Sequence, residues 1–317
     1  MIYINKLLKK GKKLRMRISV IIPSYNRAHI LEKTIPTYFQ PGVEEVLLID
    51  DCSTDSTKKV AEKLKKIFPK LKYYRMEKNS KQTGAKNKGI ELADKNNEYI
   101  YFGDDDALLM ENSIKFLTET MKKYNADLVG AKALYFKNKK ELRNIDKFIK
   151  KFKKITNKKI VDFNKLYFNF EKETEIPVEI PVTHAYFLIK KEAIGEVRFS
   201  LDYKGNCFRE ETDFILQIYK QGKKIMYDSR AIGINLPRIE ASGGAHLKGI
   251  IGKIKWNYSA IKNNNIFIEK HYEYLKENKL VKRSKINLKI LFVFQQINII
   301  LKSQIKKIIN IIKIGSF

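Results

Sequence analysis

Short apolar runs alternate with amphipathic helix patterns through the first 135 residues of the chain. The apolar, largely β-branched runs predict strands over 17–22, 45–49, 71–75, 99–102 and 127–134. The segments between them predict helices over 28–39, 53–68, 82–94 and 111–124. Repeated strand–helix units of this length are typical of a mostly parallel sheet with helices on both faces. The expected fold class is therefore α/β.

The second half of the chain has a less regular pattern. Strands are expected over 183–189 and 224–227, helices over 211–221 and 253–274, and a surface helix or insertion over 137–160. We divide the chain into a basic N-terminal segment (1–16), a main domain (17–275) and a basic amphipathic helical region (276–317). The halves of the main domain are expected at about 17–135 and 160–275.

The net charge of +29 is concentrated in three segments. Residues 1–17, 137–160 and 281–317 carry +7, +9 and +8, so the rest of the chain is nearly balanced. Basic appendages on an ordinary domain indicate an anionic surface as partner. The chain has only 2 cysteines, which excludes a disulfide scaffold and favours a reducing compartment.

The C-terminal region has a helical stripe of apolar residues among lysines. Its members fall in steps of three and four, at 290, 294, 297, 301, 305, 308 and 312. Such a helix suits an anionic membrane surface, although it could instead pack its stripe on the main domain. We find no signal peptide and no apolar segment of the roughly 20 residues that a membrane span requires. A cytoplasmic protein, peripheral at the cytoplasmic face of the membrane, is expected.

Polar clusters follow the first, second and fourth predicted strands. They comprise Pro23–Arg27, Asp50–Asp55 and Gly103–Asp106. In open α/β sheets ligands bind beyond the carboxyl ends of the strands, so these clusters are expected to form one site.

The acidic triplet Asp104–Asp106 is the strongest signal within that site. Oxygen ligands suit Mg²⁺ or Mn²⁺, and a substrate diphosphate commonly completes the coordination of such an ion. The alternative is a solvated acidic turn that caps the next helix. Asp51 is expected to bind a base or ribose, because adjacent acids at a buried strand end are costly without a partner. Ser53 and Asp55 are better explained as helix caps.

Four motifs, in order, make residues 18–106 resemble the family-2 glycosyltransferases of the GT-A fold. They are Ile18–Arg27 (ISVIIPSYNR), Leu48–Asp55 (LIDDCSTD), Gly84–Gly89 (GAKNKG) and Phe102–Asp106 (FGDDD). The second half matches more loosely, at Phe208–Asp213 (FREETD). Two departures are Cys52, where the family usually has Gly or a small polar residue, and Lys86, where Arg is common.

The resemblance implies an inverting transferase whose donor is a nucleoside-diphosphate sugar, UDP being the commonest nucleotide. It implies the following donor-binding residues: Pro23, Tyr25, Arg27, Asp50, Asp51, Lys86, Asp104 and Asp105. A Mn²⁺ or Mg²⁺ ion would lie at Asp104 and Asp106, with His246 of a glycine-rich loop as a further ligand. Glu211, or Asp213 with a shifted register, would be the general base that takes the proton of an acceptor hydroxyl. A lipid-linked glycan or surface polysaccharide would be the acceptor.

Two other functions remain open at this point. The charge alone would suit a nucleic-acid-binding protein, but we find no recognition module and expect no specific nucleic acid partner. A nucleotidyltransferase also uses acidic metal sites, yet its usual glycine-rich loop after the first strand is absent here. A dehydrogenase fails because no G-x-G-x-x-G follows that strand.

Overall fold

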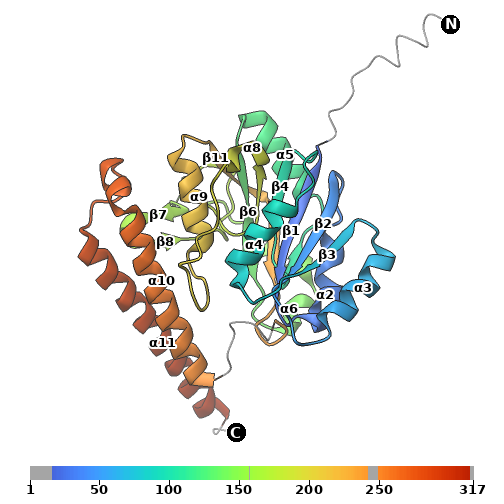
Figure 1. Cartoon of the computed structure of the whole chain (residues 1–317). Coiled ribbons are helices and arrows are strands. Elements are labelled where there is room, and N and C mark those ends of the chain that lie inside the picture. Colours follow the sequence, from blue (N-terminus) through green and yellow to red (C-terminus); the bar gives the residue numbers. More distant parts are fainter. Residues whose placement is uncertain (1–15, 157, 242–248, 315–317) are drawn as a thin grey trace, which may run out of the picture.

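The computed structural model describes residues 16–156, 158–241 and 249–314, in which helices cover both faces of a central sheet (Figure 1). Its strands are β1 (Ile18–Ser24), β2 (Val43–Asp50), β3 (Leu71–Arg75), β4 (Tyr99–Phe102), β5 (Ala107–Leu109), β6 (Leu128–Tyr135), β9 (Val178–Glu179), β10 (Phe187–Lys190) and β11 (Ile225–Asn235). A separate hairpin comprises β7 (Val161–Asp162) and β8 (Tyr167–Phe168). The helices are α2 (Ala28–Thr34), η1 (Ile35–Tyr38), α3 (Thr57–Ile67), α4 (Lys81–Leu92), α5 (Ser113–Tyr124), α6 (Lys139–Leu142), α7 (Ile145–Lys150), η2 (Phe163–Lys165), α8 (Lys191–Ile194), α9 (Glu210–Lys220), α10 (Gly249–Glu277) and α11 (Lys285–Ile314).

The large sheet has the order β3-β2-β1-β4-β10-β6-β11-β5, with β9 paired to β11. β3, β2, β1, β4, β6 and β11 run in one direction, and β10, β5 and β9 run against them. The mostly parallel α/β sheet expected from the sequence is therefore confirmed. Ser24 pairs with Asp50, which brings the ends of β1 and β2 to the same edge of the sheet.

The strands in the middle of the sheet are buried on both faces because side chains alternate along each strand. Ile21 of β1 belongs to the core under α4, α9 and α10, whereas Val20 and Ile22 belong to the core under α2, α3 and α5. α4 packs very closely on β1: a Cβ on Gly89 would lie 2.3 Å from Cγ2 of Ile21. Only glycine permits this approach, which brings α4 close enough to the strand ends to place Lys86 at the site.

Strand bounds differ from the expectation mainly in the second half. β10 begins at Phe187, four residues later than predicted, and runs antiparallel to β4 and β6. β11 continues from the predicted 224–227 to Asn235. A register shift between Asp228 and Ile232 interrupts its pairing with β6, and the polar residues at that irregularity hide the strand in the sequence.

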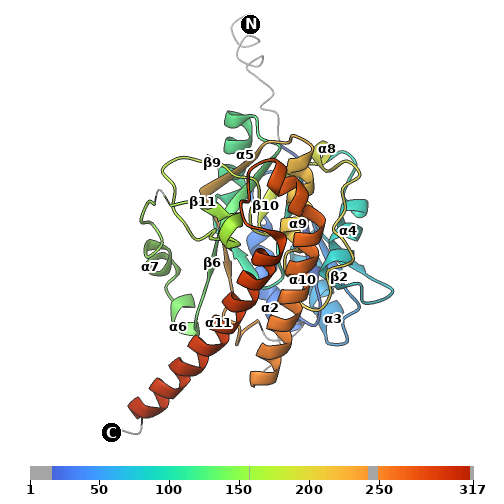
Figure 2. The same cartoon turned by 90° about the vertical axis from the view of Figure 1, so that its left-hand side faces the viewer.

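α10 and α11 lie side by side along one flank of the sheet (Figures 1 and 2). Leu288 and Phe292 of α11 are buried, with 2% and 3% of their surfaces exposed, and both belong to the core that includes α10. The apolar stripe faces elsewhere and remains exposed: Ile290 48%, Phe294 60%, Ile297 44%, Leu301 54% and Ile305 55%. At these described positions the stripe does not pack on the main domain. The remaining stripe positions, 308 and 312, have side chains that the structure does not describe. Among the described helices, none combines the length and the apolar composition that a membrane span requires.

Candidate active site

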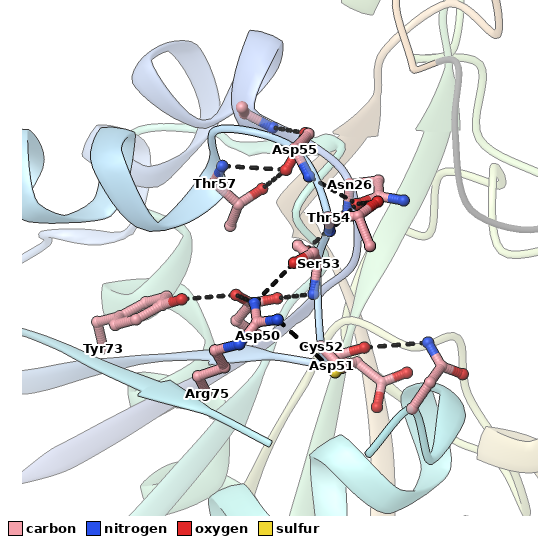
Figure 3. A network of polar contacts seen from close by, with 12 residues as sticks. Asn26, Asp50, Asp51, Cys52, Ser53, Thr54, Asp55, Thr57, Tyr73 and Arg75 are labelled. Atoms are coloured by element: carbon pink, nitrogen blue, oxygen red, sulfur yellow. Dashed lines mark hydrogen bonds and ion pairs between the residues drawn. The ribbon is translucent and has the colours of Figure 1, made fainter. Parts of the chain in front are cut away.

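A hydrogen-bond network joins the loops after β1 and β2 (Figure 3). The Oδ1 atom of Asn26 accepts hydrogen bonds from the backbone N–H groups of Thr54, at 2.7 Å, and Asp55, at 3.3 Å. In return, the backbone N–H of Asn26 donates to Oγ of Ser53 at 2.8 Å. Asn26 adopts a φ of +54°, which asparagine tolerates better than most residues. The two loops therefore form one rigid rim.

Asp50, the last residue of β2, is fully buried and holds this rim through hydrogen bonds. It accepts hydrogen bonds from the N–H of Ser53 at 2.8 Å, the hydroxyl of Tyr73 at 2.6 Å and the guanidinium of Arg75 at 3.1 Å (Figure 3). Both carboxylate oxygens thus have protein partners. This geometry favours a structural role for Asp50 over the nucleotide contact expected from the sequence.

Asp51 is the better placed of the two acids for a ligand. Its Oδ1 atom accepts a hydrogen bond from the N–H of Ser80 at 2.6 Å, just before α4 begins. Burial raises the pKa of Asp51, against the lowering effect of that N–H. Cys52 next to it has a φ of +69°, a left-handed conformation that favours glycine and explains why Cys at this position is a departure. Among the other expected contacts, Pro23 is buried in β1 and Tyr25 is half-buried at the rim.

The acidic loop after β4 is held from beneath by η1 and α2. The hydroxyl of Tyr38 donates to the carbonyl oxygen of Asp104 at 2.8 Å, and that of Thr34 donates to the carbonyl oxygen of Asp105 at 2.8 Å. A Cβ on Gly103 would lie 2.6 Å from the Tyr38 ring, so glycine permits this contact. These contacts use the backbone of the loop and leave the carboxylates of the triplet available for other partners.

Arg27 neutralises two of the three carboxylates. Its guanidinium lies 3.6 Å from Asp105 and 3.5 Å from Asp106, while also donating to the carbonyl oxygen of Ala241. Burial raises the pKa of Asp105 to about 7, and Arg27 opposes that rise. Burial also raises the pKa of Asp104 to about 7; Lys86 opposes this, and the charge of Asp106 adds to it. Two neighbouring acids that share a site in this way attract a cation.

We tested whether the residues present fit a divalent cation. In the described ranges no three His, Cys, Asp or Glu side chains converge to hold one, so a site built from protein ligands alone does not fit. Asp104 and Asp106 do fit an ion whose other ligands come from a substrate diphosphate, since their mutual repulsion is relieved by a cation. His246, the expected third ligand, lies outside the described residues.

Lys86 of α4 links the acidic loop to α9. Its ammonium is fully buried and lies 2.8 Å from Glu210 and 2.7 Å from Glu211. Burial lowers the pKa of Lys86, but the two glutamates and Asp104 outweigh burial and the net pKa is raised. Lys86 is therefore a permanent cation whose charge acts on both the acidic loop and the first turn of α9.

The pKa values of the neighbouring residues Glu210 and Glu211 are shifted in opposite directions. Burial and the charge of Glu211 raise the pKa of Glu210, whose side chain is fully buried and also accepts a hydrogen bond from Gln82 at 2.6 Å. For Glu211, burial would raise the pKa, but Lys86 reverses the direction and the net pKa is lowered. Glu211 keeps 20% of its side-chain surface exposed. It is therefore an ionised carboxylate that remains partly exposed.

Asp213, the alternative base, points to the opposite side of α9. It is fully buried, with Oδ1 2.6 Å from Nε2 of His271 in α10 and Oδ2 accepting a hydrogen bond from Gln217 at 2.9 Å. A spacing of two residues turns a helix by about 200°, so Glu211 and Asp213 cannot serve one site. The geometry favours Glu211 as the base.

Several residues around this site were not anticipated from the sequence. The buried hydroxyl of Tyr186, in the segment before β10, interacts with Asp104, and its pKa is raised first by burial and then by the charge of Asp104. Arg209, with a φ of +76°, packs its guanidinium 4.1 Å from the ring centre of Phe168 and donates to Asn264 of α10 at 3.2 Å. Arg209 thereby clamps the start of α9 to α10. Neither role leaves a local sequence signal.

Comparison with known proteins identifies the family of the chain. The model of glycosyl transferase family 2 matches residues 19–197, more than half of the chain. A Campylobacter jejuni protein named GalNAc(5)-diNAcBac-PP-undecaprenol beta-1,3-glucosyltransferase is 25% identical over 228 residues, 68% of each chain. TarS of Staphylococcus aureus, a poly(ribitol-phosphate) beta-N-acetylglucosaminyltransferase, is 29% identical over 118 residues, which cover 36% of this chain and 20% of TarS.

Solved structures share the fold at low identity. TarS 1–349 in complex with UDP superposes with a TM-score of 0.52 at 16% identity, covering 83% of this chain and 74% of that one. The mannosyltransferase PcManGT from Pyrobaculum calidifontis, in complex with GDP-Man and Mn²⁺, gives a TM-score of 0.56 at 16% identity, covering 85% and 69%. The chain belongs to glycosyl transferase family 2, and its curled sheet with flanking helices is the GT-A fold of a glycosyltransferase.

Proposed function

We propose that the chain transfers a sugar from a nucleoside-diphosphate sugar, UDP in the first place, to an acceptor hydroxyl with inversion at the anomeric carbon. The observation that carries the proposal is the arrangement around Lys86, which contacts the ionised Glu211 and acts on the pKa of Asp104. A base for the acceptor and a cation-attracting acid for the donor thus lie around one buried ammonium.

The nucleotide would bind along the rim formed by the loops after β1 and β2. Asp51 would receive the base or ribose, with Pro23 and Tyr25 beside it, and the diphosphate would extend toward Asp104. Preformed loops favour binding, because the hydrogen bonds of Asn26 have already ordered them.

A divalent cation, Mn²⁺ or Mg²⁺, would be held by Asp104 and Asp106 together with the donor's phosphates. When bound it supplies positive charge that stabilises the departing nucleoside diphosphate. Arg27 keeps Asp105 and Asp106 in place, and Lys86 adds a fixed positive charge on the same side. Buried fixed charges of this kind need no reorganisation during the reaction.

Glu211 would act as the general base. A hydroxyl is a poor nucleophile near neutral pH, and a positioned carboxylate typically contributes about 10²–10⁴ to the rate by accepting its proton. Lys86 keeps Glu211 ionised in its largely buried position. A single base on one side of the donor is consistent with a one-step displacement.

The acceptor would be a lipid-linked glycan or a surface polysaccharide, as the names of the C. jejuni and S. aureus relatives suggest. The exposed stripe of α11, with Phe294 60% and Ile290 48% exposed, would lie in the interface of an anionic membrane. The basic segments around it would add electrostatic attraction, about 1 kcal/mol for each Lys or Arg near the surface. The enzyme would then work as a peripheral protein at the cytoplasmic face.

Calorimetric titration with UDP, GDP and dTDP, in Mn²⁺ and in chelator, tests the donor site. We expect one nucleotide to bind in a metal-dependent manner and the Asp104→Ala/Asp106→Ala variant to lose that binding. The control is Asp146→Ala, which removes an exposed acid of α7 and should bind normally. If no nucleotide binds to protein whose unfolding transition is normal, the proposed function is wrong and the basic segments become the first candidate for its role.

A further inference from the structure

A cavity of about 300 Å³ lies between the end of β6, the β7–β8 hairpin and the segment that precedes β10. Its wall is mainly aromatic, and it includes Tyr135, Tyr167, Phe168, Phe170, Glu171 and His184. This is the lower end of the volumes of ligand pockets, and the mixture of aromatic rings with a few polar groups is typical of them. Neither the donor nor the cation described above needs this cavity.

The inner wall of the cavity packs against Tyr186, whose ring centre lies 4.7 Å from that of His184 and whose hydroxyl acts on the pKa of Asp104. The hydroxyl of Tyr135 lies 2.5 Å from Nε2 of His184. Burial raises the pKa of Tyr135, and the charges of Asp104 and Glu211 raise it further. The same Glu211 opposes burial, which lowers the pKa of His184 to about 4. A ligand in the cavity would therefore lie on the side of the site where Glu211 is.

Two polar groups of the wall lack partners in the described part of the chain. Nδ1 of His184 is buried without a hydrogen bond. Glu171 is half-buried and forms no ion pair with any described residue, and burial raises its pKa against the opposing effect of Lys137. A buried polar atom without a partner is costly, so Nδ1 of His184 is matched to a ligand that brings a hydroxyl or amide group, and the half-buried carboxylate of Glu171 is available to accept a hydrogen bond from the same ligand.

We propose that this cavity is the acceptor site and that it takes an uncharged pyranose ring rather than a phosphate-bearing polyol. The inference rests on the proposed function. Aromatic faces such as the ring of Tyr167, which is 43% exposed, pack against the apolar face of a sugar ring. Glu171 and His184 then bond to its hydroxyl or N-acetyl groups.

The charge of the cavity supports the choice of a neutral ring. Its lining contains the carboxylate of Glu171 and no lysine or arginine. Lys172 lies 5.2 Å from the centre of the Tyr167 ring, and Lys132 is held by Glu173. A phosphate in the cavity would meet the carboxylate of Glu171 and would find no lysine or arginine in the lining to pair with, which disfavours it.

Saturation-transfer NMR tests the proposal without knowledge of the donor sugar. The probes are methyl glycosides of glucose, galactose and their N-acetylated 2-amino forms, with ribitol 5-phosphate as the charged polyol. The protein is used as the full chain with UDP and Mn²⁺ present. We expect transfer from aromatic protons to one face of at least one glycoside, and none to ribitol phosphate.

Two variants assign the signal to the cavity. Tyr167→Ala removes the exposed ring and should weaken glycoside binding about tenfold. Glu171→Gln should weaken it several-fold while keeping the shape, and its matched control is Glu175→Gln, an exposed acid outside the lining that should bind as wild type. Glycoside binding that is unchanged in both variants, or preferential binding of ribitol phosphate, would overturn the proposal.

Nucleotide binding, measured on the same samples, separates this inference from the proposed function. If UDP and the other nucleotides fail to bind, the donor site itself is wrong. If a nucleotide binds normally to wild type and to both variants while no glycoside binds, the acceptor assignment alone is wrong. A normal unfolding transition in Tyr167→Ala shows that any loss is local, as expected for a half-exposed ring at a hairpin.

Discussion

Replacing Lys86 by methionine tests how the site keeps its base ionised. Methionine matches the lysine side chain as far as Cε and lacks the ammonium group, in a position where the side chain is fully buried. At the 2.7 Å separation of Lys86 and Glu211, an effective dielectric of about 20 gives an attraction of about 6 kcal/mol. Relaxation and solvent entry reduce the observable effect, so we expect the pKa of Glu211 to rise by about 1–3 units.

The sign of the pH effect follows from the role of Glu211. In wild type its pKa is lowered below the ordinary value of a glutamate, so the base stays ionised throughout the neutral range. In Lys86→Met the pKa rises, so the pH at which kcat/KM falls on acidification should move upward relative to wild type. The assay is a pH profile of kcat/KM at saturating Mn²⁺. An acid limb that does not move would refute the assignment of Glu211 as a base held ionised by Lys86.

The same substitution should also cost stability. Removing one partner of a buried ion pair typically costs about 3–5 kcal/mol, because the other charge is left without compensation. We expect this loss in urea unfolding at pH 7, and a smaller loss near pH 5, where Glu210 and Glu211 become neutral more readily. Lys86→Arg is the matched control, because it keeps the charge and should retain both the wild-type pH profile and most of the stability.

Three further predictions concern other parts of the account. Glu211→Gln should lower kcat by about 10²–10⁴. Glu210→Gln should keep kcat within about tenfold of wild type, because Glu210 is fully buried and its raised pKa favours the neutral acid, which glutamine resembles. Steady-state transfer rates in the reverse order would contradict this. Without a bound metal, the pKa of Asp104 is about 7, and metal binding requires its ionised form. The affinity for Mn²⁺, measured by calorimetry with the nucleotide present, should therefore fall as the pH is lowered from 8 to 6. An affinity that does not depend on pH would exclude Asp104 as a ligand. Phe294→Asp should weaken binding to anionic vesicles, measured by co-sedimentation, at least tenfold. The control Ile67→Asp changes an equally exposed isoleucine of α3 and should bind as wild type. Equal effects of the two changes would exclude the stripe as the membrane contact.

The first half of the fold was readable from the sequence because its elements are local. β3 and β4 have the predicted bounds, since each is a short segment rich in aromatic residues next to a residue that stops a helix or strand, such as Pro69 and Gly103. The three polar clusters could be assigned to one site because parallel strands end at the same edge of a sheet. The second half contains antiparallel strands and a polar irregularity near Asp228, which periodicity does not reveal.

The site itself was only partly predictable. Lys86 and Glu211 were singled out from their motifs, but their ion pair joins residues 125 positions apart and depends on how α4 and α9 pack. The opposite pKa shifts of Glu210 and Glu211 arise from that packing, so no sequence pattern contains them. The aromatic cavity has the same origin, because β6, a hairpin and the segment before β10 assemble it.

The stripe of α11 shows a different limit. Its period predicts that one side of the helix is apolar, and the structure has that stripe at Ile290 and Phe294. Periodicity cannot tell which apolar residues face the protein, and here Leu288 and Phe292 face α10 while the stripe is left exposed.

The stereochemistry of transfer tests the central claim most directly. The purified protein would be incubated with Mn²⁺, an α-linked nucleoside-diphosphate sugar and a neutral glycoside acceptor, and the product's anomeric proton followed by NMR from the first turnover. One base at Glu211 and a single displacement predict a β-linked product with no α-linked product at any time. An α-linked product, or transfer that survives in Glu211→Gln at the wild-type rate, would contradict the account.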